Sequence, residues 1–182
     1  MKVLALASIL STFAVEVLAM ALPSTPFVCV NEEVLATYPI GKNKEVQARV
    51  LSCSDLPNVM GRSAGQKRQT NVCGNACTTN CFSPAGGGPN PNDCQVIADA
   101  LLYDSQNIGA LFNIFVGSPI YMQYASCETF FVNQASYNET YCRTDWSSIV
   151  SYVATNCQSQ QNAHGGNCVA SDQTWFIQVQ TS

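Results

Sequence analysis

Two stretches after residue 90 space their apolar residues as amphipathic helices do. The first stripe consists of Cys94, Ile97, Ala98, Leu101 and Leu102, at positions i, i+3, i+4, i+7 and i+8. The segment Asn90-Pro91-Asn92-Asp93 supplies its start signal, and Gly109 its expected end. The second stripe consists of Trp146, Ile149, Val150, Val153 and Cys157. It predicts a helix over residues 144–157 that turns Trp146 toward the core.

Other stretches have the composition of strands. Residues 110–116 are rich in aromatic and β-branched side chains, and residues 121–132 predict one or two further strands around Cys127. Residues 175–179 alternate as a half-buried terminal strand would. Residues 69–88 and 158–166 are polar, and we expect loops there. The order helix, strands, helix, strand predicts an α+β fold, a small single-domain α/β sandwich with a mixed sheet and about two main helices.

The N-terminal third has the features of a processed, secreted chain. An apolar run of about 13 residues follows Lys2 and ends in small residues, which predicts a signal peptide over residues 1–21. That run is too short to span a bilayer, so no membrane anchor is expected. Lys67-Arg68 predicts a maturation site, although a dibasic pair can equally be a surface charge pair. We therefore expect a pro-segment over residues 22–68 and a mature domain over residues 69–182.

The charged residues are distributed differently before and after the dibasic pair. Residues 69–182 contain one cation, Arg143, against seven carboxylates. An acidic surface repels phosphate backbones and anionic lipid headgroups, so neither nucleic acid nor a membrane surface is an expected partner. Arg143 lies within four residues of Glu139 and Asp145. We expect it to form a structural ion pair with them, the alternative being that it holds an anionic or polyhydroxyl ligand.

The cysteines predict a disulfide framework. Two of them, Cys29 and Cys53, precede the dibasic pair, and eight follow it: Cys73, Cys77, Cys81, Cys94, Cys127, Cys142, Cys157 and Cys168. In an oxidising compartment these eight form up to four disulfides, whose pairing the sequence leaves open. Cys142 and Cys157 should not pair if both lie on one helix, because they would be too far apart. Zinc binding by Cys73, Cys77 and Cys81 is the weaker alternative, and we expect no metal or cofactor.

Candidate chemistry favours binding over catalysis. The single histidine, His164, lies in a Gly-Gly turn, and no serine stands in a Gly-x-Ser-x-Gly elbow. Residues 69–182 contain fourteen aromatic side chains and twenty-three amide side chains. Sugars are held by such residues, because a pyranose stacks on aromatic rings while amides bind its hydroxyls. Asn138 begins the sequon Asn138-Glu139-Thr140, which predicts a glycosylated surface loop.

Several ordered segments resemble one family of secreted mushroom proteins. They are Asp93-Cys94-Gln95-Val96-Ile97, Cys127-Glu128-Thr129-Phe130-Phe131-Val132-Asn133, Tyr141-Cys142-Arg143-Thr144-Asp145-Trp146, Asn156-Cys157, Gly165-Gly166-Asn167-Cys168-Val169-Ala170 and Asp172-Gln173-Thr174-Trp175-Phe176-Ile177-Gln178-Val179. Together they are similar to the glycan-binding family of the Y-three protein. The resemblance implies a lectin without enzymatic activity, a disulfide-held α/β sandwich and a homodimer.

The sequence thus predicts a secreted glycan-binding protein. We expect its sugar surface to use exposed aromatic, amide and polar residues near the Gly-Gly loop: Trp175, Tyr121, Tyr124, Asp172, Asn162 and His164. One alternative is a small secreted hydrolase that uses His164 or paired carboxylates such as Asp172. Another is a secreted effector that acts by protein contact.

Overall fold

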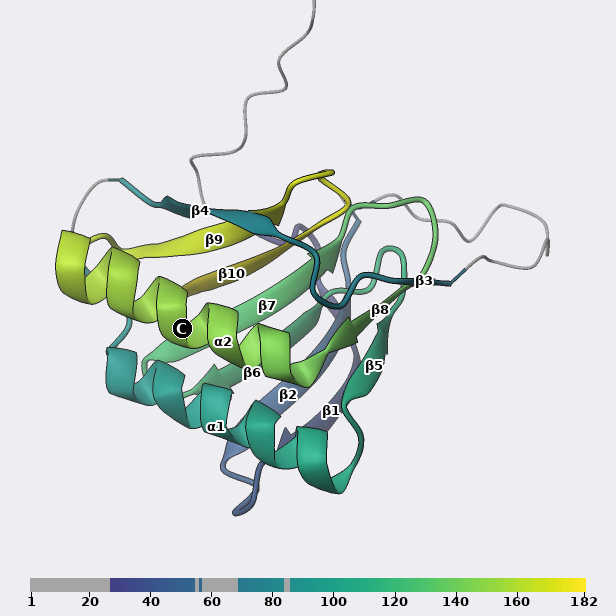
Figure 1. Ribbon diagram of the computed structural model, residues 1–182, viewed down its shortest axis with the longest axis horizontal. Helices are drawn as coiled ribbons and strands as arrows, with labels where there is room; N and C mark the ends of the chain where they lie inside the picture. Colours follow the sequence, from purple (N-terminus) through teal and green to yellow (C-terminus); the bar gives the residue numbers. More distant parts are fainter. Residues whose placement is uncertain (1–26, 55, 57–68, 84–85) are drawn as a thin grey trace, which may run out of the picture.

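A computed structural model of the chain describes residues 27–54, 56, 69–83 and 86–182. Two α-helices lie on one face of a seven-stranded sheet, which confirms the predicted α+β single-domain fold (Figure 1). The main sheet has the order β1-β2-β6-β7-β10-β9-β4, and each strand in it is antiparallel to its neighbours. Only the smaller sheet, β3-β8-β5, is mixed.

The elements follow one another with short connections. They are β1 (Glu33–Ile40), β2 (Val46–Ser52), β3 (Thr70–Asn71), β4 (Cys77–Cys81), α1 (Pro91–Asn107), β5 (Leu111–Ile114), β6 (Ile120–Tyr124), β7 (Cys127–Asn133), β8 (Glu139–Cys142), α2 (Arg143–Val153), the π-helix η1 (Ala154–Gln160), β9 (Gly165–Ala170) and β10 (Trp175–Thr181).

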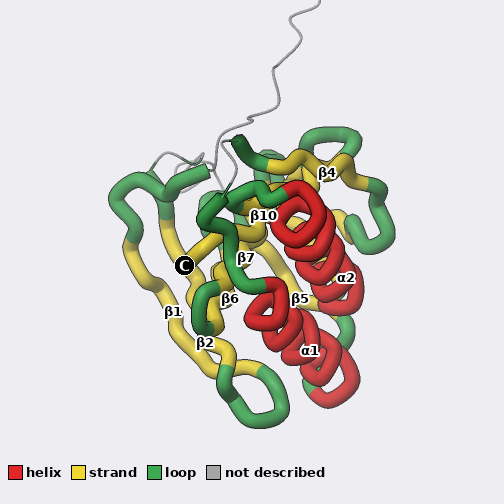
Figure 2. The backbone as a smooth tube through the Cα atoms, turned by 90° about the vertical axis from the view of Figure 1, so that its left-hand side faces the viewer, coloured by secondary structure: helices red, strands yellow, loops and turns green. Residues whose placement is uncertain are grey.

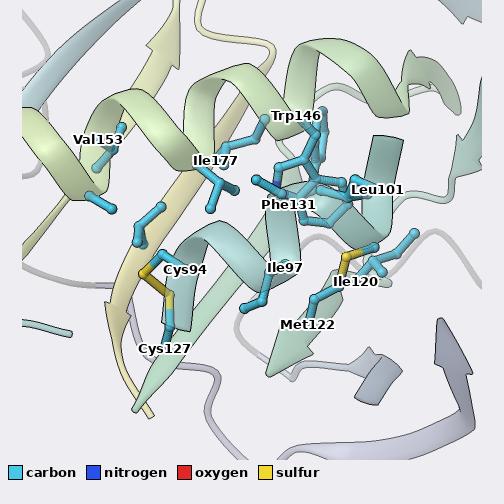
Figure 3. Packing of buried hydrophobic residues seen from close by; sticks show 14 of the residues in the cluster. Cys94, Ile97, Leu101, Ile120, Met122, Cys127, Phe131, Trp146, Val153 and Ile177 are labelled. Carbon is cyan, nitrogen blue, oxygen red and sulfur yellow. A yellow bond between two sulfur atoms is a disulfide. The ribbon is translucent and has the colours of Figure 1, made fainter. Parts of the chain in front are cut away.

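Both predicted helices form. The side-chain oxygen of Asn90 accepts from the Asn92 N–H at 3.0 Å, which caps the first turn of α1. Helix α2 begins one residue earlier than predicted and continues as the π-helix. The two helices lie side by side on the same face of the sheet (Figure 2). Between them and the sheet is the core, where Trp146, Phe131 and Ile177 meet (Figure 3).

The last strand differs from its prediction. Strand β10 lies between β7 and β9, and its first five residues are buried on both sides of the sheet. Trp175, Ile177 and Val179 face the helices, whereas Phe176 belongs to a second apolar cluster on the other face. We call that other side the open face, because neither helix covers it. The alternating pattern predicted one buried side, but side chains on both sides of β10 are buried.

Two expected loops contain regular structure. Strand β4 forms within residues 69–88 and pairs with β9, while residues 158–166 contain the end of the π-helix and the start of β9. Strand β4 is a Thr- and Asn-containing edge strand between two cysteines. Strand β4 is held in the sheet by its neighbour β9 and by two disulfides. Its composition alone therefore does not predict a strand.

Residues ahead of the dibasic pair also join the sheet. Strands β1 and β2 form an antiparallel hairpin, and β2 pairs with β6 through four residue pairs from Gln47↔Gln123 to Val50↔Ile120. These strands lie within the segment predicted to be removed on maturation. Lys67, Arg68 and the predicted signal peptide lie outside the described residues.

All ten cysteines are paired in five disulfides. The pairs are Cys29–Cys53, Cys73–Cys142, Cys77–Cys168, Cys81–Cys157 and Cys94–Cys127. As predicted, Cys142 and Cys157 do not pair with each other. Cys73, Cys77 and Cys81 each bond to a distant partner, which leaves no thiolates for the zinc site considered as an alternative. Such a framework fits an oxidising compartment.

No helix within the described residues is long and apolar enough to span a bilayer.

Candidate ligand-binding cleft

Two of the aromatic rings predicted to contact sugar are buried. Trp175 is 0 % exposed and stacks on Phe131 with ring centroids 5.4 Å apart. Tyr121 is 5 % exposed and stacks on Phe130 at 4.4 Å. The first ring lies in the core beneath the helices and the second in the cluster on the open face. Neither can offer a ring face to a ligand in solution, so the expectation that they are exposed platforms is wrong.

The remaining four predicted residues do not converge. Asn162 and His164 precede β9, whereas Asp172 lies in the turn after it. A six-residue strand separates these positions by roughly 20 Å. Tyr124 ends β6 and packs against the main core. His164 lies beside the Phe82 ring at 5.7 Å, and Asp172 Oδ1 accepts from the backbone N–H and the hydroxyl of Thr174.

Arg143 differs from its prediction and marks a different site. Its guanidinium forms no ion pair with Glu139 or Asp145 in the described structure, where the one ion pair joins Arg49 and Glu128. Instead, Nη1 donates to the carbonyl oxygens of Gly109 and Leu111 at 2.6 and 2.7 Å. The guanidinium also lies over the Phe112 ring, 5.3 Å from its centroid. This leaves further N–H donors of Arg143 for a ligand, because a guanidinium has five.

Arg143 lines a cleft between the β1–β2 hairpin, the C-terminal half of α1, and β5. The volume of this hairpin cleft is about 410 Å³, within the range of small-molecule sites. Its floor is apolar and comes from β1, β2, α1 and β6: Ile40, Val50, Leu101, Ile120 and Met122. Three aromatic side chains, Tyr38, Phe112 and Phe115, complete the wall. Phe115 is 52 % exposed, so its ring is available to a ligand.

The polar groups of the hairpin cleft come from elements far apart in sequence. Asp104 is only 3 % exposed, and its Oδ1 accepts from the Gly41 N–H at 3.2 Å. Burial raises the pKa of Tyr38, while the positive charge of Arg143 opposes the rise and the negative charge of Asp104 adds to it. Tyr38 is therefore a neutral phenol at physiological pH, able to donate and accept hydrogen bonds. Asn113 adds an amide.

A second, shallower concavity lies between α2 and the edge strand β4. The volume of this α2–β4 groove is about 520 Å³, and it is more open than the hairpin cleft. Cys77 and Cys168 line it, so the disulfide between them holds its two strands together. Tyr152 is 58 % exposed at its edge, beside the amide of Asn156 and the hydroxyls of Thr79 and Ser148. A tyrosine among hydroxyl and amide groups is also a reasonable sugar contact.

A buried acid near Asp172 bears on the hydrolase alternative. Glu139 is 0 % exposed, and the Thr174 side chain and the Asp172 carboxylate lie near its carboxyl group. Burial raises the pKa of Glu139 to about 7; the Thr174 side chain opposes the rise, and the Asp172 carboxylate adds to it. A pKa near 7 suits a general acid. Glu139 has no exposed atoms, however, so a substrate cannot reach its carboxyl without a structural change.

The predicted glycosylation site lies at the end of the loop between β7 and β8. Asn138 is half-buried, and its Oδ1 accepts from the Val116 N–H at 3.3 Å. The Thr140 hydroxyl of the sequon is buried and contacts the Gln69 side chain at 2.6 Å. Glycosylation at Asn138 stays a prediction.

Most residues of the hairpin cleft carry no signal in the sequence that marks them as a site. Tyr38 and Ile40 lie in the predicted pro-segment, and the strand pattern around Phe112 does not show which distant residues lie beside it. Only Arg143 carried a usable signal, as the single cation after residue 68. No protein-family model matches the chain, and no curated protein or solved structure is significantly similar to it.

Proposed function

We propose that the chain is a secreted, non-catalytic protein that binds a carbohydrate in the hairpin cleft. The observation that carries the proposal is the combination there of three aromatic side chains with a cation, a carboxylate and an amide around an apolar floor. Aromatic rings hold the apolar face of a pyranose, and planar polar groups bind its hydroxyls. The sequence resemblance to a glycan-binding family points in the same direction.

The apolar floor narrows the class of sugar. Ile40, Leu101 and Met122 offer no hydrogen bonds to hydroxyl groups, so a fully hydroxylated sugar would lose its hydration there. A sugar with an acetamido substituent could place the methyl group on this floor. Its ring would then lie against Tyr38 or Phe115, and its hydroxyls would face Arg143 and Asn113. We therefore expect N-acetylated sugars to bind better than their hydroxylated counterparts.

The arrangement supports binding more than turnover. Among the described residues, Asp104 is the one carboxylate that lines the hairpin cleft. Glycoside hydrolysis usually needs two carboxyl groups on either side of the scissile bond. His164, the one histidine of the chain, is near the start of β9 and does not line this cleft.

A glycan array with matched variants tests the proposal. The parent protein should retain a related set of N-acetylated glycans, and Phe115→Ala should weaken that retention about tenfold, equivalent to about 1.4 kcal/mol of lost stacking and burial. Tyr152→Ala is the control, because it removes a similarly exposed aromatic ring from the α2–β4 groove. If only Tyr152→Ala loses glycan retention, the sugar site lies in that groove instead.

A second candidate function follows from the floor of the hairpin cleft. A small apolar molecule with one anionic or hydroxyl group would also fit, because the lining is mainly apolar with Arg143 beside it. A fluorescent apolar probe distinguishes the two functions. If the parent binds the probe, Phe115→Ala abolishes that binding and the glycan array is blank, the apolar ligand is favoured and the sugar is excluded.

A further inference from the structure

We infer that residues 27–53 are a permanent part of the folded protein, held without a covalent cross-link. Cleavage after Arg68 would then produce a two-chain protein instead of a domain freed of its pro-segment. This inference is independent of the ligand of the hairpin cleft. It concerns what the mature molecule consists of, and it rests on four sets of contacts.

The disulfides fall into two groups, divided at the dibasic pair. Cys29 bonds to Cys53, and the other four disulfides join cysteines between residues 73 and 168. No disulfide therefore connects residues before Lys67 with residues after Arg68. The N-terminal segment has its own cross-link, which restrains its two ends whether or not the chain is cut.

The hairpin completes the sheet and the core. Val46 and Ala48 of β2 are fully buried and belong to the same core cluster as Ile120 and Met122 of β6. Without the hairpin, β6 would be an edge strand with unpaired backbone groups beside exposed apolar side chains. Such an edge favours aggregation. Removing the segment would therefore damage the domain that it was expected to release.

The tip of the hairpin is fitted closely to α1. At Gly41, where φ is +88°, an added Cβ atom would lie 2.8 Å from Cβ of Ala100. The Gly41 N–H donates to the buried carboxylate of Asp104. A glycine at this point satisfies both requirements, because it adopts positive φ readily and permits the close approach.

Contacts on the open face hold the other end of the segment. The Phe27 ring lies 5.9 Å from Phe130 and 5.7 Å from Phe176, and the Phe27 N–H donates to Oε1 of Gln178 at 3.1 Å. Gln178 is completely buried, so loss of Phe27 would deprive a buried amide of partners. The segment thus contacts the helix side, the edge and the open face of the sheet.

An ion pair joins the N-terminal segment to the rest of the domain. Arg49 Nη2 lies 3.0 Å from Glu128 Oε2, and Glu128 is 9 % exposed. Burial raises the pKa of Glu128, and the positive charge of Arg49 opposes that rise. Without β2, this largely buried carboxylate would keep only the amide of Gln180 as a hydrogen-bond partner.

Mass measurements on the secreted protein test the inference. If the protein arrives as one chain, it is first treated with a dibasic-specific endoprotease. Under denaturing conditions without reductant, the protein should then give two polypeptides, one ending at Arg68 and the other beginning at Gln69. Native mass spectrometry should find the two together at a 1:1 ratio. Loss of the N-terminal polypeptide under native conditions would overturn the inference.

A matched pair of variants shows which contacts hold the second chain. Ala48→Glu places a carboxylate in the core, whereas Ala36→Glu makes the same change at an exposed position of the same hairpin. After cleavage, Ala48→Glu should release the N-terminal polypeptide during gel filtration and Ala36→Glu should retain it. If Ala48→Glu is not secreted, Arg49→Met provides a milder change outside the core, and its second chain should dissociate at a lower urea concentration than that of the parent. Equal retention in all these proteins would contradict the assigned contacts.

Discussion

Glu139 should make the stability of this protein fall as pH rises through the neutral range. Burial raises the pKa of its carboxyl from 4.5 to about 7 in the folded state. Between these two values the folded state binds more protons than the unfolded state, so the free energy of unfolding decreases with increasing pH. The stabilisation is complete below about pH 4.5 and is lost by the time the pH passes the folded pKa of about 7.

The magnitude follows from the size of the shift. Each pKa unit corresponds to about 1.36 kcal/mol, so a shift from 4.5 to about 7 is equivalent to about 3 kcal/mol. With a urea dependence of about 2 kcal/mol per molar, typical of small domains, this change moves the unfolding midpoint by about 1.5 M. Gln has nearly the same shape as the protonated acid but does not ionise. Glu139→Gln should therefore remove this part of the pH dependence.

The assay is urea unfolding of the parent and of Glu139→Gln at pH 4, 5.5, 7 and 8, with the disulfides intact. As the pH rises, the urea midpoint of Glu139→Gln should increase relative to that of the parent. Glu33→Gln, at an exposed position of β1, is the control and should run parallel to the parent at every pH. A constant difference between Glu139→Gln and the parent would refute the reasoning, because it would mean that Glu139 binds its proton equally well in the folded and unfolded states.

Two further predictions concern the core and the sheet. Thr129→Val should cost about 1–3 kcal/mol, because Trp146 Nε1 donates to the Thr129 hydroxyl at 3.1 Å and would be left unpaired in the core. Urea unfolding measures this, and Thr37→Val on the exposed strand β1 should change stability little. Gly166→Ala should cost about 1–3 kcal/mol, since its Cβ would lie 2.7 Å from both Asn80 O and Cys157 Sγ. An unchanged thermal midpoint in that variant would contradict the packing described between β9, β4 and the π-helix.

The helices were predictable because their signals are local. The Asn90 cap and the apolar stripe of α1 lie within 18 consecutive residues, and so do the determinants of α2. Trp146 was assigned to the core for the same reason, and it is fully buried. The structure also agrees with the geometric argument that separated Cys142 from Cys157.

The candidate site was much less predictable. The sequence predicts Trp175 and Tyr121 as exposed rings, yet both are buried because β6 and β10 are interior strands with packed residues on each face. Sequence periodicity gives the side of a strand on which a residue lies. It does not tell how many layers cover that side.

By itself, the sequence determined the fold class, the two helices, the even cysteine count and the acidic character of residues 69–182. Each of these depends on composition or on spacing within one segment. Only the tertiary structure decided the disulfide pairing, the central place of β10 and the insertion of the β1–β2 hairpin beside β6. It also brought Tyr38, Asp104 and Arg143 to one cleft. The physical reason is that strand pairing and cleft formation join residues far apart in sequence, and such contacts depend on the complementarity of whole surfaces.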